Sequence, residues 1–85
     1  MALTLLYFAW VREGIGRGAE EVEPPADVAT VAALIAWLRG QSAGHAEALA
    51  EPARLRAAVD QRFVTLDASI VGAREVALFP PVTGG

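Results

Sequence analysis

The end of this sequence, where residues 79–85 read Phe-Pro-Pro-Val-Thr-Gly-Gly, carries its most distinctive chemistry. Prolines lack the N–H group that a strand ladder needs and have a fixed φ, so a strand should stop near Phe79 and continue as a stiff, extended chain. Glycine has no side chain, so a partner's narrow channel would admit Gly84 and Gly85 and bring their backbone close to a nucleotide. The α-carboxylate of Gly85, delivered in this way, would be suited to activation by ATP and attack by a nucleophile.

The alternative interpretation is an inert end, because chain termini are often frayed and rich in small residues. Here the diglycine follows a strand-like apolar run, residues 76–79, and a rigid proline pair, which favours a functional end. Six residues beyond Phe79 reach at most about 20 Å when fully extended. We accordingly divide the chain into a domain over residues 1–79 and an extended tail over residues 80–85.

The composition describes one small globular domain. The chain has 85 residues, of which 54% are hydrophobic and 20% charged, a balance typical of a folded protein. It has no cysteine, which excludes disulfides, iron–sulfur clusters and thiolate nucleophiles. The net charge of −3 argues against nucleic acid as a partner. The sequence contains no apolar run of membrane-spanning length and no basic signal-like start, so we expect a cytoplasmic protein without membrane contact.

The internal residues offer little chemistry of their own. His45 is the only histidine, so it has no second histidine or cysteine with which to share a metal ion; we expect it on the surface and expect no metal site. No set of residues suggests general acid–base catalysis. All seven basic residues are arginines, so the chain has no lysine side chain to which another copy could be linked.

The first half of the chain predicts a hairpin followed by a helix. Residues 3–11 are rich in β-formers and predict a central strand, with residues 3, 5 and 7 on one face. Residues 19–23 predict an edge strand that pairs back on the first. Thr30 is a good N-cap, and the helix that it begins is expected to end at a Gly40 cap. The apolar stripe of this helix has helical spacing: Val31, Leu34, Ile35 and Leu38.

The second half predicts three more strands. Residues 43–49 add a helical turn, residues 55–59 and 63–66 predict a hairpin, and residues 76–79 predict the last strand. Ile70 is expected in the core. A hairpin, a helix and further strands make the α+β pattern of the β-grasp, or ubiquitin-like, fold. We expect a mixed sheet of four to five strands with one main helix packed across it and the diglycine tail leaving the last strand.

The chain resembles the small, sulfur-carrier subunit of molybdopterin synthase over nearly its whole length. Residues 75–85, Glu-Val-Ala-Leu-Phe-Pro-Pro-Val-Thr-Gly-Gly, match the terminal signature of that family and form the most specific motif. The weaker similarities are the opening strand at residues 6–13, the helix start at 30–34 and the hairpin at 57–61. One departure is Gly72-Ala73-Arg74, where the family often has Asp-Gly-Asp, so the turn glycine is shifted by one place.

The resemblance implies a mechanism and partners. An adenylating, E1-like enzyme would use ATP on Gly85, and a sulfur donor system would convert the adenylate into a thiocarboxylate. The large catalytic subunit, in a heterotetramer, would then accept the tail and pass the sulfur to cyclic pyranopterin monophosphate, which forms the dithiolene of molybdopterin. No cofactor would be bound, and the chain would be a sulfur-donating subunit without a catalytic site.

The resemblance also implies the binding residues. An apolar patch of Phe8, Phe63 and Phe79 would dock the partners, with Arg12 and Arg74 as candidate flanking charges, although the sequence leaves Phe63 open as surface or core. The tail residues expected in the partner's channel are Pro80, Pro81, Val82, Thr83, Gly84 and Gly85. Three alternatives remain: a thiamine-pathway sulfur carrier, a ubiquitin-like modifier conjugated through Gly85, and an interaction module with an inert tail.

Overall fold

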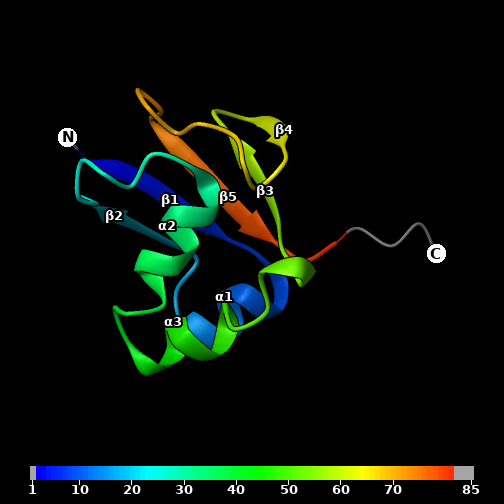
Figure 1. Ribbon diagram of the computed structural model, residues 1–85. Coiled ribbons are helices and arrows are strands. Elements are labelled where there is room, and N and C mark those ends of the chain that lie inside the picture. The colour runs from blue at the N-terminus through cyan, green and yellow to red at the C-terminus, as the bar shows by residue number, and fades with distance from the viewer. Residues whose placement is uncertain (1, 82–85) are drawn as a thin grey trace.

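The computed structural model describes residues 2–81. Within them a five-stranded mixed sheet has the order β2-β1-β5-β3-β4, and β1 and β5 are its parallel pair (Figure 1). The strands are β1 (Leu3–Tyr7), β2 (Ala19–Val22), β3 (Arg56–Val59), β4 (Arg62–Val64) and β5 (Glu75–Phe79). The helices are α1 (Ala9–Ile15), α2 (Val31–Leu38), α3 (Ala43–Ala48) and the short 3-10 helix η1 (Pro52–Arg54).

The helix α2 forms where its sequence pattern predicts it. The Thr30 side chain accepts a hydrogen bond from the Ala33 N–H at 3.1 Å, as an N-cap does. All four residues of the predicted stripe are buried, and they pack on the sheet face that carries Leu5 and Tyr7. The C-cap of the helix is Arg39, in a helical conformation, and not Gly40, which lies one residue further on.

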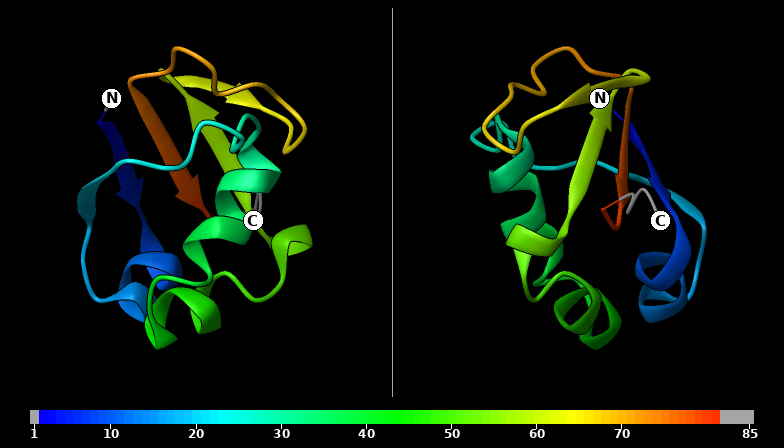
Figure 2. Two further views of the ribbon diagram at one scale, coloured as in Figure 1. Left: turned by 60° about the vertical axis from the view of Figure 1, so that its left-hand side comes forward. Right: turned by 90° about the vertical axis from the view of Figure 1, so that its right-hand side faces the viewer.

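The first predicted strand is too long. β1 ends at Tyr7, and the residues that follow turn into α1, where Val11 is fully buried. Two glycines bring α1 against α3: a Cβ on Gly14 would stand 2.8 Å from the Ala48 Cβ, and one on Gly44 would stand 2.7 Å from the Gly14 carbonyl oxygen. Both views in Figure 2 place α1 beside α3 at one end of the sheet. This close packing of segments distant in sequence explains why the β-rich composition of residues 8–11 does not decide their structure.

Most of the remaining expectations about the fold are confirmed, although β4 covers Arg62–Val64 and not residues 63–66. β1 is internal and β2 is an edge strand, and Ile70 is 7% exposed. The β3–β4 hairpin turns at Asp60 and Gln61, whose φ values of +49° and +70° are the left-handed pair that a type I′ turn requires. The sheet and its helices form the predicted α+β architecture, with more helical segments than the one main helix expected.

Candidate functional site: an apolar sheet face beside the tail

Within residues 2–81, the helices cover one face of the sheet, and the opposite face is largely apolar (Figure 2). Along β1 the odd-numbered residues point into the core, so Leu6 points to the opposite side. The strand register then places Leu6 of β1 beside Ala77 of β5, and Ala77 beside Ala58 of β3. Ala58 in turn lies opposite Phe63 of β4. Small alanines in the middle of this row and large side chains around it produce a hollow of about 680 Å³. We call this surface the outer apolar face; its lining is Leu6, Phe8, Ala9, Ala58, Phe63, Ala77, Phe79, Pro80 and Pro81, together with the polar residues Gln61 and Glu75.

The three phenylalanines proposed from the sequence lie together on this face. Phe8 is 48% exposed and Phe63 is 85% exposed, so the question left open for Phe63 is answered in favour of the surface. The rings of Phe63 and Phe79 lie 5.8 Å apart and are tilted by 57°. Exposed aromatic side chains around an apolar hollow are typical of a protein-binding surface, because they bury a large area when a partner covers them.

The other proposed site residues are placed differently. Pro80 and Pro81 line the hollow. Arg12 does not: it lies on α1, and its side chain packs over Gly18. Residues 82–85, which include the proposed reactive carboxylate, lie outside the described residues, so the division at residue 80 and the roles of the tail stay predictions.

Six lining residues were not singled out as site residues from the sequence: Ala9, Gln61 and Glu75, and a row of three across the sheet, Leu6, Ala58 and Ala77. Alternation along each strand indicates which residues share a face. The register between β1, β5 and β3 was also needed to bring these three into one row, and a single sequence does not specify that register.

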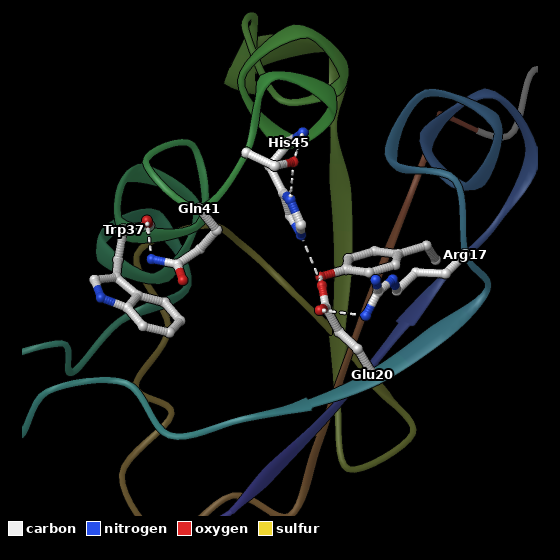
Figure 3. Close-up of polar contacts among 7 residues, drawn as sticks. Arg17, Glu20, Trp37, Gln41 and His45 are labelled. Atoms are coloured by element: carbon white, nitrogen blue, oxygen red, sulfur yellow. Dashed lines mark hydrogen bonds and ion pairs between the residues drawn. The ribbon is translucent and has the colours of Figure 1, made fainter.

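The expectation that His45 lies on the surface is wrong. His45 is 6% exposed, and its Nε2 lies 2.7 Å from the Glu20 Oε2, while its Nδ1 lies 2.7 Å from the Ser42 Oγ. Figure 3 shows Glu20 between His45 and Arg17. The Tyr7 hydroxyl also donates to the Glu20 Oε2 at 2.6 Å, so β1, β2 and α3 are tied together by one buried polar network.

The electrostatics of this network suit a structural role. Burial alone would raise the pKa of Glu20, but hydrogen bonds from Tyr7 and His45 and the nearby positive charges outweigh it and lower that pKa. Burial, and then the bond to Glu20, raises the pKa of Tyr7, so its hydroxyl remains a donor at neutral pH. Among residues 2–81, no buried side-chain nitrogen or oxygen lacks a partner. The network is therefore closed, and it lies on the helix side of the sheet, away from the outer apolar face.

The described residues contain neither a group of potential metal ligands nor a helix that could span a membrane. Within residues 2–81, no group of three or more His, Cys, Asp and Glu side chains is arranged to hold a metal ion. In the same residues no helix is both long and apolar enough to cross a bilayer.

A mixed sheet with its last strand in the middle and helices on one face defines a β-grasp, ubiquitin-like protein. SAMP1 from Haloferax volcanii has this fold. Its superposition on this chain covers 100% of both chains with a TM-score of 0.73, although only 24% of residues are identical. A putative molybdopterin converting factor, subunit 1, from Pyrococcus furiosus has a TM-score of 0.72 and 28% identity over 96% of this chain and 99% of that one.

Sequence comparison narrows this class to a family. The model of the ThiS family matches residues 5–85, and the chain belongs to that family. The molybdopterin synthase sulfur carrier subunit of Escherichia coli (strain K12) is 47% identical over 83 residues, which span 98% of this chain and 99% of that protein. The family resemblance inferred from the terminal motif is confirmed.

Proposed function

We propose that this chain is the sulfur-carrier subunit of a molybdopterin synthase and that the α-carboxylate of Gly85 carries the sulfur. The observation that carries the proposal is the 47% identity with the E. coli sulfur carrier subunit, which extends over 99% of that protein. The diglycine at residues 84 and 85 supports it, because glycine has no side chain that would hinder attack on its carboxylate.

The chemistry proceeds in three steps. On the adenylating enzyme, the Gly85 carboxylate attacks the α-phosphorus of ATP, which gives the acyl adenylate and releases pyrophosphate. A sulfur nucleophile at the oxidation level of sulfide, supplied by the sulfur donor system, adds to the acyl carbon, and AMP leaves. The thiocarboxylate sulfur then adds to an electrophilic carbon of cyclic pyranopterin monophosphate and replaces an oxygen substituent, whose C–O bond breaks; hydrolysis of the acyl–sulfur bond leaves the sulfur on the substrate and returns the Gly85 carboxylate. Two such transfers supply both dithiolene sulfurs.

The chain itself contributes docking and delivery to these steps. Its buried Tyr7–Glu20–His45 network is closed and lies on the helix side of the sheet, so the large catalytic subunit supplies the acid–base groups, within a heterotetramer. The outer apolar face borders the root of the tail at Pro80 and Pro81. A partner that covers this face is therefore positioned to take up the tail in the same encounter.

The test is the intact mass of the protein purified from its native host without reducing agent or amine buffer. We expect a fraction with one sulfur in place of one oxygen, absent when Gly85 is deleted. Oxidation of a side chain gives nearly the same mass change, so an alkylating reagent specific for thiols separates the two. Because the chain has no cysteine, only a thiocarboxylate reacts with it. Unmodified protein, even after co-expression with the activating enzyme and a sulfur donor, would contradict the proposal.

The ThiS family match keeps a thiamine-pathway carrier as the second candidate, since its terminal chemistry would be the same. Mixing the thiocarboxylated protein with the large subunit and the pterin precursor, or with the thiazole-forming system, separates the two. Conjugation to lysines as a modifier has less support, because the 24% identity with SAMP1 shows the fold alone. Gly85-dependent conjugates in cell extracts would favour that alternative.

A further inference from the structure

The root of the tail has two flanks, and both can be identified from the strand register. β5 runs between β1 and β3, with Leu78 opposite Tyr7 and Phe79 opposite Arg56. The chain beyond Phe79 therefore starts between the β1–α1 junction and the segment that links η1 to β3 (Figure 1). Two guanidinium groups, of Arg54 and Arg56, belong to that second flank.

Arg56 is held in place by main-chain carbonyls. Its Nη1 donates to the Leu55 carbonyl at 2.9 Å and to the Ala53 carbonyl at 3.3 Å. A guanidinium carries five N–H donors, so the others remain available on its exposed side. Arg56, Phe63 and Phe79 also line a second hollow of about 270 Å³. An ordered cation thus lies at the edge of the outer apolar face.

Arg54 is ordered by a different contact. Its guanidinium carbon lies 5.3 Å from the centroid of the Trp10 ring, a cation–π arrangement. Trp10 belongs to α1 on the first flank, so this contact joins the two flanks across the end of β5. Stacking on the ring orders the guanidinium and leaves its N–H groups along the edge free to reach an acceptor.

Neither arginine is neutralised by the part of the chain that the structure describes. Within residues 2–81, the ion pairs join Glu20 to Arg17 and to His45, and no carboxylate lies within 4.0 Å of Arg54 or Arg56. The whole chain is acidic, with a net charge of −3, so two unneutralised cations near the end of β5, one of them beside Phe63 and Phe79, differ from the average surface. Pre-ordered charged groups lose less entropy on binding than mobile ones.

We propose that Arg54 and Arg56 form a cationic rim on the outer apolar face and pair with carboxylates of the large catalytic subunit, beside the entrance through which that subunit takes up the tail. This inference rests on the proposed function. The tail from residue 80 to 85 spans up to about 20 Å, so the two guanidinium groups act on the surface of the partner and not at the acyl group of Gly85.

The experiment compares charge reversals in the full chain. Arg54→Glu and Arg56→Glu are matched by Arg39→Glu, an equal change at an exposed residue at the end of α2. Isothermal titration with the purified large subunit, at low and high salt, gives each Kd. We expect each rim variant to bind about tenfold more weakly at low salt, with a smaller difference at high salt, and Arg39→Glu to stay within about twofold of the wild type.

Two further measurements separate pairing from folding. Thermal unfolding of the rim variants should match that of Arg39→Glu, and reversal of a nearby acidic residue on the large subunit should restore the affinity of Arg56→Glu. Rim variants that bind as tightly as Arg39→Glu would overturn the proposal, as would a wild-type chain that does not bind the large subunit. The proposed function is judged separately, by the mass of the Gly85 terminus.

Discussion

Replacing Glu20 by alanine tests the buried polar network most directly. The Glu20 side chain is 12% exposed, and its Oε2 is the acceptor for the Tyr7 hydroxyl at 2.6 Å and for His45 Nε2 at 2.7 Å. Tyr7 is 1% exposed and His45 is 6% exposed. Removal of the carboxylate therefore leaves two buried polar groups without their acceptor, on two different elements of the fold.

The magnitude follows from these contacts. A buried donor that loses its partner costs about 1–3 kcal/mol, so two of them cost about 2–6 kcal/mol together. The Arg17–Glu20 pair adds little, because Arg17 is 60% exposed and exposed ion pairs contribute about 0–1 kcal/mol. A domain of this size is stable by about 4–13 kcal/mol, so the loss in Glu20→Ala is a large fraction of the total.

The assay is urea unfolding at neutral pH, followed by circular dichroism. Glu21→Ala is the matched control, because Glu21 is the next residue on β2 and its side chain is exposed; we expect it to change the free energy of unfolding by less than about 0.5 kcal/mol. If Glu20→Ala were as stable as Glu21→Ala, the assignment of the network as a stabilising unit would be refuted.

The difference in unfolding free energy between the wild type and Glu20→Ala should depend on pH. The pKa of Glu20 is lower in the folded state than its ordinary value, so the folded state favours the ionised carboxylate. Its contribution is fully present above the ordinary pKa of a glutamate and is lost as the pH falls through the lowered, folded-state value. The advantage of the wild type over Glu20→Ala should therefore shrink below about pH 4. A constant difference down to strongly acidic pH would show that the charge on Glu20 is not what stabilises the network.

Two other substitutions test packing and the hairpin. A Cβ at Gly44 would stand 2.7 Å from a main-chain oxygen of α1, whereas one at Gly40 would meet its nearest atom at 3.5 Å; Gly44→Ala should cost about 1–2 kcal/mol and Gly40→Ala almost nothing in the same unfolding assay. Equal stability of the two variants would show that α1 and α3 separate easily. The Asp60 Oδ1 accepts hydrogen bonds from the N–H groups of residues 74 and 75 at 2.9 and 3.0 Å; Asp60→Ala should cost about 1–2 kcal/mol, while Asp60→Asn retains an acceptor and should cost less than half as much. If Asp60→Asn were destabilised as much as Asp60→Ala, the two hydrogen bonds to Asp60 Oδ1 would not be what stabilises this hairpin.

The sequence by itself determined the elements whose causes are local. Thr30 caps α2 because its hydroxyl reaches an N–H group three residues ahead, and the stripe of that helix follows from helical periodicity. Strand alternation placed Leu3, Leu5 and Tyr7 on one face, and the structure shows that this face is the buried one. The order of the elements then indicated the fold, and the terminal motif indicated the family.

Only the tertiary structure decided what depends on distant partners. His45 is buried because Glu20, 25 residues earlier, provides the acceptor that its ring requires, and no pattern around His45 reveals that partner. β1 stops at Tyr7 because α1 must pack on α3 through closely spaced glycines. The outer apolar face exists because the register of β1, β5, β3 and β4 aligns small alanines between large side chains. Local propensity acts over a few residues, whereas burial and register are set by contacts between segments that only the folded chain brings together.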